Sequence, residues 1–427
     1  MRALITTFGS RGDLNPFVAL ARALRERRHE VTWAVEDALA SDVRSAGFAD
    51  VRHLTGDVQR ALAPAQHALY QGGPIGSLRV IFDRYILPTL DAKVADLRDV
   101  VDEVDLVVAP PPHFAAAIAA ERGAKPWATV VLSPAALPSA GLDPHPLPFA
   151  VPPSLQRLSN RLLWGLGELA LRRVADGPVN AARRRYGLPT HRGLLAAGGL
   201  SPALAALAMS PSFIARQPDW PRQVQVTGFC FWDGAGGWNE PGELTGFLDD
   251  ASSPIVAMSV GSSAGLAGEM FAPSFVATRD AVRAIGARLL AIGAPPEAIG
   301  APARDVLAIP FAPFSRVYPR CAAVVHHGGV GTIAQALRAG VPMLILPWGA
   351  DQFMNAGLVT QAGLGTALSL RRYRAPIASL ALRDLLENEK RRTHARRLAD
   401  AIAREDGARA LCEVLEQLVV RWSARQM

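Results

Sequence analysis

The stretch His326-His-Gly-Gly-Val-Gly-Thr-Ile-Ala-Gln335 decides the fold. The apolar run that leads into it, from Ala322, predicts a buried strand, the glycines predict a tight turn, and the residues after them predict a short helix. Glycine lets the backbone approach a ligand closely, and the free N–H groups at a helix start attract an anion. His327 adds a hydrogen-bond donor at the same place. The stretch therefore predicts an anion site at the edge of a parallel sheet.

Two further motifs follow this turn, Gly340-Val-Pro342 and Pro347-Trp-Gly-Ala-Asp-Gln352. The second motif comes after the next predicted strand, so its polar residues should lie at the same sheet edge. A carboxylate and an amide side by side, here Asp351 and Gln352, suit the hydroxyls of a sugar. The pattern indicates a ligand with an anionic part and a sugar part.

The alternation of strand and helix extends through the whole chain. Between the first two predicted strands, Gly9 to Asp13 predicts a tight turn, and Asn15 and Pro16 predict the start of a helix that runs to Arg28. Apolar runs predict strands over residues 3–8, 29–35, 104–109, 129–132, 254–260, 288–292, 305–309, 322–326 and 341–346. This order is typical of doubly wound α/β sheets.

A turn-rich stretch near residues 228–242 divides the chain into two halves. We expect an N-terminal Rossmann-like domain over 1–232, a linker over 233–250, a C-terminal Rossmann-like domain over 251–405 and a terminal helix over 406–427. The two domains are expected to face each other across a cleft, which is the default ligand site in such an architecture.

Composition narrows the function further. The chain has 427 residues and a net charge of +7, with its basic residues scattered, so we do not expect nucleic-acid binding. The three cysteines, Cys230, Cys321 and Cys412, are far apart and match neither a disulfide framework nor a zinc site. No segment resembles a secretory signal or a good membrane span. We therefore expect a cytoplasmic protein.

A dinucleotide fingerprint is the first alternative. Gly329-Val-Gly-Thr-Ile-Ala334 matches G-x-G-x-x-A, and Asp351 follows at a suitable distance. The first strand-turn-helix of the chain lacks this fingerprint, however, and paired histidines before the glycines are not part of it. An NAD-dependent oxidoreductase is therefore disfavoured.

The motifs together resemble the donor signature of family 1 nucleotide-sugar-dependent glycosyltransferases, which have the GT-B fold. Gly9-Ser-Arg-Gly-Asp-Leu-Asn-Pro16 is similar to the acceptor-side motif of that family. Asp219-Trp-Pro221 and Val226-Thr-Gly-Phe-Cys-Phe-Trp-Asp233 resemble sterol glucosyltransferases and the rhamnosyltransferases that build rhamnolipids. The resemblance extends over about residues 1–420, and it implies the two-domain fold expected above, with the terminal helix over 406–427 crossing back to the first domain.

The resemblance implies a role for each matching residue on the acceptor side. Asp13 occupies the position of the catalytic base, and Ser10 and Arg11 stand beside it in the motif. Many relatives carry a histidine base that a later aspartate orients. The corresponding region here, Ala109-Pro-Pro-Pro-His113, has no aspartate, so the chain resembles the subgroup that uses an aspartate directly. His113 is the only nearby titratable group. The alternative interpretation is that His113 is an ordinary loop histidine without a catalytic role.

On the donor side, the resemblance assigns the diphosphate and the nucleotide base to different segments. His327 and the amides of Gly329, Val330, Gly331 and Thr332 would hold the diphosphate, with Ser262 facing it. Phe311 would stack on the base and Ala312 would present its backbone to the base edge, where relatives have Trp-Ala. Gln335 replaces a glutamate that holds ribose hydroxyls in many UDP-sugar enzymes, so both UDP and dTDP stay open.

The acceptor is predicted from the apolar composition of residues 62–88 and 134–175. These segments contain Phe149 and Trp164 and few charges, which suits a lipophilic acceptor with a hydroxyl group. The alternative is ordinary core packing. Leu147, Phe149 and Trp164 also suggest peripheral contact with the inner face of a membrane.

The resulting hypothesis is an inverting glycosyltransferase that needs neither a cofactor nor a metal, since its co-substrate is a UDP- or dTDP-sugar. No Asp-x-Asp triplet occurs in the sequence. The acceptor would be a lipid, sterol or hydrophobic natural product, or alternatively a polyketide, peptide antibiotic or flavonoid-like compound. A non-catalytic binder of the same fold is a further alternative, which the presence of Asp13 disfavours.

Overall fold

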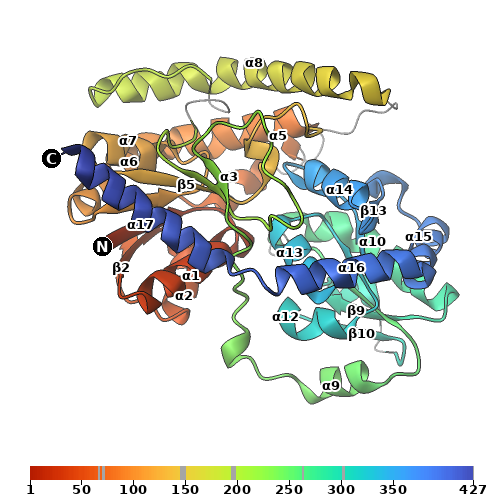
Figure 1. The fold of residues 1–427 in the computed structure, drawn as a ribbon. Coiled ribbons are helices and arrows are strands. Elements are labelled where there is room, and N and C mark those ends of the chain that lie inside the picture. Colours follow the sequence, from red (N-terminus) through yellow and green to blue (C-terminus); the bar gives the residue numbers. More distant parts are fainter. Residues whose placement is uncertain are drawn as a thin grey trace. The chain divides into compact units, whose positions relative to one another are not determined.

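The computed structural model describes residues 1–426 except 66–67, 70–72, 145–150, 194–198, 262–263 and 301–302. The chain forms two compact units. The first consists of Met1–Phe231 together with Asp406–Met427, and the second of Trp232–Glu405 (Figure 1). The second unit is thus inserted into the sequence of the first.

The first unit is built on a seven-stranded parallel sheet with the order β3-β2-β1-β4-β5-β6-β7. Its strands are β1 (Arg2–Thr7), β2 (Glu30–Val35), β3 (Val51–His53), β4 (Leu106–Ala109), β5 (Trp127–Val131), β6 (Ala205–Leu207) and β7 (Val224–Val226). Strands β1, β4 and β5 are apolar and almost wholly buried, as expected for a sheet that is covered on both faces.

Helices connect these strands and cover the sheet. They are α1 (Arg11–Glu26), α2 (Asp37–Ser45), α3 (Val58–Leu62), α5 (Gly73–Ile81), α6 (Leu87–Asp102), α7 (Phe114–Arg122) and α8 (Pro153–Arg185), with a π-helical turn over Phe82–Ile86 between α5 and α6. Helix α8, which has 33 residues, packs against α5 and α6. The core of this unit is therefore closed by a second helical layer.

Helix α1 begins earlier than the sequence predicts. The predicted start lies at Asn15 and Pro16, whereas the helix starts at Arg11, with Ser10 as its N-cap and Pro16 inside it. The carboxylate of Asp13 accepts hydrogen bonds from the backbone N–H and the hydroxyl of Ser10, at 2.8 and 2.9 Å. This reciprocal cap outweighs the start signal at Asn15.

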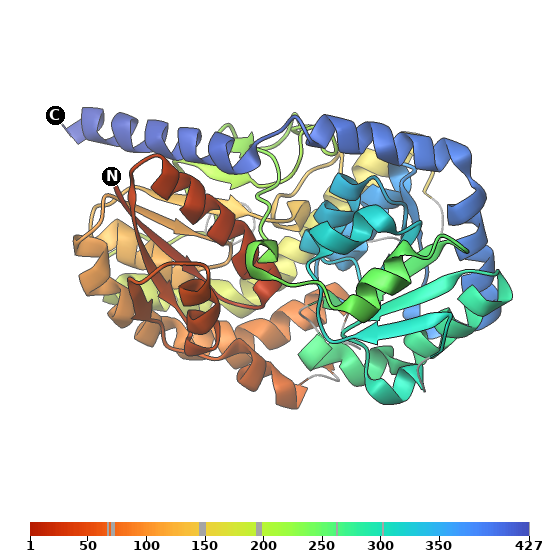
Figure 2. The ribbon, with the colours of Figure 1, turned by 90° about the horizontal axis from the view of Figure 1, so that it is seen from below.

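The last helix, α17 (Gly407–Gln426), belongs to the first unit. It lies along α1 (Figure 2), and its Leu411, Cys412 and Leu415 are fully buried. The chain enters it by way of Gly407, whose α-carbon approaches the backbone of Gly228 so closely that a β-carbon would lie 2.3 Å from that carbonyl carbon.

The second unit contains a six-stranded parallel sheet with the order β10-β9-β8-β11-β12-β13. Its strands are β8 (Ile255–Ser259), β9 (Arg288–Ile292), β10 (Val306–Ile309), β11 (Ala323–His326), β12 (Met343–Ile345) and β13 (Gly365–Ala367). Its helices are α9 (Gly242–Asp249), α10 (Ala264–Ala284), α11 (Pro296–Ile299), α12 (Phe314–Val317), α13 (Val330–Ala339), α14 (Gln352–Gln361), α15 (Ala375–Glu387) and α16 (Glu389–Ile402). The expected α/β class, with two Rossmann-like doubly wound sheets, is confirmed.

Residues 233–250, expected as a linker, lie within the second unit. They contain α9, and Arg320 binds both Glu240, at 2.8 Å, and Asp249. The abundance of glycine and proline in this stretch produces turns there, but polar contacts tie those turns to the 3₁₀ turn Tyr318–Arg320 of the second unit.

Each sheet reverses its strand order at one point. The reversal lies between β1 and β4 in the first unit and between β8 and β11 in the second. Strands on the two sides of such a point send their connections in opposite directions, which leaves a crevice at their carboxyl ends. The residues that follow β1, β4, β8 and β11 are therefore the ones to examine for chemistry.

Candidate active site

The glycine-rich turn after β11 presents backbone N–H groups at the switch point of the second sheet. Gly328 has φ +97°, which favours glycine, and Gly329 is the N-cap of α13. The N–H groups of Val330 and Gly331 fall in the first turn, where a helix supplies no internal acceptor. The turn and the helix dipole together suit a bound anion, as the sequence predicts.

His327 lies at the same point, next to the turn after β8. Gly261 has φ +61°, and a β-carbon there would lie 3.0 Å from Cε1 of His327. Burial lowers the pKa of His327 to about 4, so its ring is neutral near pH 7. Its Nδ1 is buried and has no hydrogen-bond partner among the residues that the structure describes. The neighbouring His326 differs, because its Nδ1 accepts the N–H of Gly328 at 3.1 Å.

Asp351 and Gln352 begin α14, but their side chains are partly engaged within the protein. The amide oxygen of Gln352 accepts N–H groups from Trp348 and Gly349 at 3.0 and 3.4 Å, so it braces the preceding turn. Asn355, which the sequence analysis missed, donates to Asp351 at 2.8 Å and to the carbonyl of Gly328 at 3.1 Å. The sequence could have indicated Asn355, because a residue four positions after Asp351 lies on the same face of a helix. Asn355 thereby links Asp351 to the glycine-rich turn.

Gln335 is buried in α13 between two charged side chains. Its amide nitrogen lies 3.5 Å from a carboxylate oxygen of Asp233, and its amide oxygen accepts from Arg338 at 2.8 Å. The same oxygen of Asp233 accepts the N–H of Ser315 at 2.9 Å. Asp233 and Arg338 were not predicted as site residues. They constrain Gln335, so its amide group is less available to a ribose than the sequence suggests.

The segment after β10 holds the remaining donor-side residues. Phe311 is 49% exposed, which leaves its ring face open for stacking, whereas Ala312 is buried. Ser262 lies outside the described residues. Thr332 is buried, lies near Gly261 and donates its backbone N–H to the carbonyl of Gly329 at 3.1 Å.

In the first unit, Asp13 lies in the first turn of α1, the helix that follows β1. Burial raises the pKa of its carboxyl group, and the two hydrogen bonds from Ser10 offset part of that rise. Gly9 has φ +110°, and a β-carbon there would lie 2.5 Å from the carboxylate, so glycine is required beside it. Arg11 turns toward α2, where it is exposed and pairs with Asp42 at 2.5 Å. An aspartate with a raised pKa can act as a general base.

His113 follows β4, the strand that pairs with β1 at this switch point. Its Nδ1 accepts the N–H of Ala116 at 3.3 Å and so caps α7, which assigns the proton to Nε2 for a hydrogen bond of 3.0 Å with the hydroxyl of Thr6. Burial lowers the pKa of His113 to about 3, with a smaller contribution from Lys93. His113 is thus a neutral, hydrogen-bonded histidine that caps a helix.

A buried ionic cluster lies near His113 and was missed from the sequence. Glu36, at the end of β2, accepts hydrogen bonds from Tyr85 and, at 3.2 Å, from Lys93. The ammonium group of Lys93 lies 5.1 Å from the ring centroid of Phe8, whose ring also contacts His113. Burial lowers the pKa of Lys93. The residues of this cluster are tens of positions apart in the sequence, so no local motif predicts that they meet.

Many apolar residues expected to line an acceptor site are core residues instead. Phe82, Tyr85, Leu137 and Leu142 are buried in the first unit. Trp164 is partly buried, and its indole N–H donates to the carbonyl of Leu142 at 3.2 Å. Phe149 and Leu147 lie outside the described residues.

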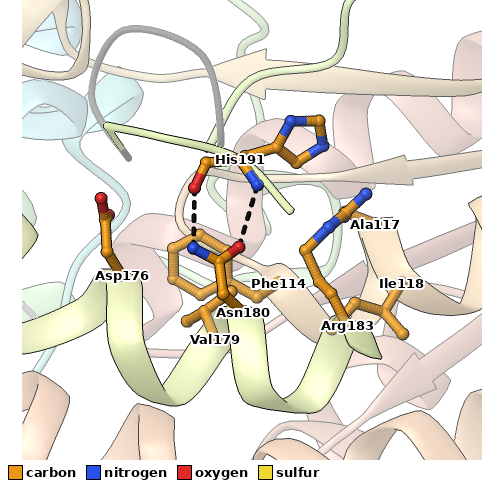
Figure 3. A pocket seen from close by; sticks show the side chains of 8 residues that line it. All are labelled: Phe114, Ala117, Ile118, Asp176, Val179, Asn180, Arg183 and His191. Carbon is orange, nitrogen blue, oxygen red and sulfur yellow. Dashed lines mark hydrogen bonds between the residues drawn. The ribbon is translucent and has the colours of Figure 1, made fainter. Parts of the chain in front are cut away.

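A small cavity between α7 and α8 is shown in Figure 3. It has a volume of about 10 Å³, enough for one water molecule at most. Asn180 exchanges two hydrogen bonds with the backbone of His191 beside it, at 2.7 and 2.9 Å. The cavity is a packing gap and not a substrate site.

Neither a metal-binding cluster nor a membrane-spanning helix occurs among the residues that the structure describes. Nowhere among them do three His, Cys, Asp or Glu side chains gather in a way that could hold a metal ion. None of the described helices combines the length and apolarity needed to cross a membrane.

Family models match both ends of the chain. Residues 3–68 match the glycosyltransferase family 28 N-terminal domain, and residues 295–418 match the erythromycin biosynthesis protein CIII-like C-terminal domain. The first match contains Asp13, and the second contains the glycine-rich turn of α13.

Known proteins match almost the whole chain. It is 34% identical to O-mycaminosyltylonolide 6-deoxyallosyltransferase of Streptomyces fradiae, over 98% of this chain and 97% of that protein. It is 26% identical to the sterol 3-beta-glucosyltransferase UGT80A2 of Arabidopsis thaliana, over 95% of this chain and 64% of the relative. The glycosyltransferase VinC, solved in complex with dTDP, has a similar fold, with a TM-score of 0.70 at 21% identity over 99% of this chain and all of that one.

Proposed function

Since this chain belongs to the family 1 type of nucleotide-sugar glycosyltransferases with the GT-B fold, we propose that it moves a sugar from a dTDP- or UDP-sugar to a hydroxyl group of a lipophilic acceptor. The observation that carries the proposal is the switch point of the second sheet. There, buried His327 lies beside a glycine-rich turn and the first turn of α13. Such a site suits a diphosphate.

The proposed reaction is a single displacement at the anomeric carbon, with inversion and without a metal. Asp13 takes the proton from the acceptor hydroxyl as the oxygen attacks. The bond between the anomeric carbon and the diphosphate breaks, and the leaving group gains negative charge. His327, the N–H groups of Val330 and Gly331 and the dipole of α13 stabilise that charge. Ser262 is proposed to face the same diphosphate.

Sugar and base contacts complete the proposed donor site. Asp351 would bind sugar hydroxyls, and Gln352 would hold the turn beside it and offer its amide N–H groups. Phe311 would stack on the base, and Ala312 would present its backbone to the base edge. Asp233 and Arg338 hold the amide group of Gln335, so this group is less free to bind ribose hydroxyls. This favours dTDP over UDP, because the sugar of dTDP lacks the 2′-hydroxyl.

The acceptor is proposed by analogy with the relatives. Two of the relatives are named for a tylonolide derivative and for a sterol glucosylated at its 3β position, which are different classes of hydroxylated hydrophobic molecule. We propose an acceptor of natural-product or sterol type, with Ser10 and His113 on the acceptor side. An acceptor of this kind partitions into bilayers, so we also propose peripheral contact with a membrane. We propose a cytoplasmic protein, because its three cysteines are free and buried.

Calorimetric titration with dTDP, UDP and NAD tests the donor site. We expect binding of dTDP or UDP in the wild type and at least tenfold weaker binding in His327→Ala, because a buried hydrogen-bond donor to the diphosphate is lost. Leu380→Gln, which replaces an exposed leucine of α15 in the same unit, is the matched control. Binding of NAD alone would refute the proposal.

Transfer itself is tested by mass spectrometry. Purified protein is incubated with each nucleotide sugar and either O-mycaminosyltylonolide or a 3β-hydroxysterol, and products are scored by the added mass of the sugar. A glycosylated product that requires Asp13 supports the proposed role. Nucleotide binding without transfer to any hydrophobic alcohol would contradict the acceptor class.

A further inference from the structure

Helix α8 carries a row of exposed leucines along one face. Leu155, Leu158, Leu162, Leu166 and Leu169 are 45–61% exposed, and they account for five of the nine large apolar residues that are prominently exposed in the described part of the chain. They recur at intervals of three, four, four and three residues, so they repeat with the period of the helix. At 1.5 Å per residue the row is about 21 Å long. We call these five residues the leucine row.

The leucine row lies opposite the face by which α8 packs on the first unit. At 3.6 residues per turn, the five leucines fall within an arc of about 80°. Buried Asn160, Leu171 and Ala175 fall roughly on the other side of the helix. The helix therefore has an apolar face toward the protein and a second apolar face directed outward.

Hydrogen bonds fix this orientation at both ends of α8. Near its start, the side chains of Asn160 and Trp164 donate to the carbonyls of Ala140 and Leu142, at 3.1 and 3.2 Å. Near its end, buried Arg183 pairs with Glu121 (2.5 Å), and Asn180 binds the backbone of residue 191 (Figure 3). Rotation of α8 to bury the leucine row would break these bonds.

Charges around the leucine row are almost all positive. Arg161, Arg172 and Arg173 are exposed on the same helix and lie inside the arc of the leucine row or within about 60° of it, whereas Arg157 lies near the packed face and acts on Asp219. Over residues 153–175 the only acidic residue is Glu168, which is paired with Arg172 at 3.1 Å. An apolar row bordered by arginines is the pattern of a helix that lies in the interface of a bilayer with anionic headgroups.

We propose that the outward face of α8 binds the surface of an anionic lipid bilayer. The leucine row would enter the boundary between headgroups and acyl chains, and the arginines would contact lipid phosphates. This inference rests on the proposed function, because a lipophilic acceptor dissolves in the bilayer. Binding of α8 to the bilayer would hold the first unit next to that acceptor.

A second copy of the chain fits this face less well. Two leucine rows placed face to face would bring the arginines of both copies together, and Glu168, the one acidic residue of the described stretch 153–175, is already paired with Arg172. Like charges at a contact are repulsive. An anionic bilayer satisfies the leucines and the arginines together.

The test is vesicle flotation of the full chain. Vesicles of phosphatidylcholine with about one-third phosphatidylglycerol are compared with vesicles of phosphatidylcholine alone, at low and at physiological salt. Leu162→Gln/Leu166→Gln should lower the partition coefficient by about 30-fold, which corresponds to about 2 kcal/mol. Arg161→Gln/Arg173→Gln should lower binding to the anionic vesicles by a similar factor and reduce its salt dependence.

The matched control is Ile377→Gln/Leu380→Gln, which removes two exposed apolar side chains from α15. It should bind vesicles as the wild type does. Circular dichroism and thermal midpoints check that each variant is folded. Glycosyl transfer to a water-dispersed acceptor is measured without vesicles, so that failure of the proposed function is seen separately from failure of this inference.

Three results would overturn the proposal. The first is a wild type that does not float with anionic vesicles at low salt. The second is equal binding by the wild type and the leucine variant. The third is a concentration-dependent dimer in sedimentation, abolished by the leucine substitutions and unaccompanied by vesicle binding, which would assign the leucine row to a second copy.

Discussion

Replacing Asp13 by asparagine separates the catalytic role of this residue from its structural one. The carboxylate accepts two hydrogen bonds from Ser10 at the start of α1, and it also stands where a general base is proposed. Asparagine has nearly the same size and keeps an acceptor oxygen, but it cannot take a proton from a hydroxyl. The substitution should therefore leave the helix in place and remove the base.

The two roles predict effects of different size. Loss of a general base costs about 10²- to 10⁴-fold in kcat, or roughly 3–5 kcal/mol of barrier. Loss of a carboxylate from a helix N-terminus costs about 0.3–1 kcal/mol. Since burial raises the pKa of Asp13, its ionised form is already disfavoured, and a neutral amide recovers part of that cost. We expect the thermal midpoint to change by less than about 4 °C.

The assay measures release of nucleoside diphosphate in the presence of the acceptor found by mass spectrometry, together with the Kd for the nucleotide from calorimetry. In Asp13→Asn, kcat should fall by at least 100-fold while the nucleotide Kd stays within about twofold of the wild type. The wild-type rate should fall as the pH drops through the pKa of Asp13, because the base must be ionised, and that pKa lies above the usual value.

Ser10→Ala is the matched variant. It removes one donor to the carboxylate, so the pKa of Asp13 should rise further and the acid limb of the rate profile should move to higher pH, with the plateau rate retained. A helix-cap role alone predicts similar rate losses in both variants. Asp13→Asn with a rate near that of the wild type, or Ser10→Ala with an equally large loss, would refute the assignment.

Three further predictions concern stability. Lys93→Met should lower the free energy of unfolding by about 3 kcal/mol, because it leaves Glu36 buried without its cation, and Lys93→Met/Glu36→Gln should recover part of the loss in a urea titration. Gly407→Ala should cost about 1–3 kcal/mol by the same method, because its methyl group would meet the backbone of Gly228. Arg27 and His29, in the turn between α1 and β2, lower the pKa of Glu416 to about 2. The stabilising contribution of Glu416 is therefore full above pH 4.5 and is lost as the pH falls through about 2. Glu416→Gln should remove this difference, which is about 1 kcal/mol for a pair near the surface.

The longer strands were predictable because parallel strands that are buried on both faces have continuous apolar sequences, whereas the three-residue strands β3, β6, β7 and β13 were not predicted. Strands such as 288–292 agree with the structure to the residue, and 322–326 agrees within one residue. Helix starts were harder to predict. Asn15 and Ser10 are both good N-cap residues, and the carboxylate of Asp13 decides between them by closing the capping box at Ser10.

The candidate site was predictable where its residues are local in sequence and not where they are distant. The glycine-rich turn and His327 were identified from one stretch. The partners of Gln335 include Asp233, about a hundred residues away, and Glu36 and Lys93 meet only through the packing of α6 on the sheet. The direction of the leucine row was hidden for another reason: both faces of α8 carry apolar residues, so the sequence alone does not say which face packs inward.

The insertion of the second unit into the first has a consequence for synthesis on the ribosome. The sheet of the first unit emerges before residue 232, but α17, which covers α1, is made last. During translation of the inserted unit, the apolar face of α1 that includes Leu20 lacks its native cover. Because the ribosome makes the chain from its N-terminus, the first unit is completed only when the last residues have been made. Nascent chains stalled near residue 405 should therefore be the ones that ribosome-associated chaperones bind longest.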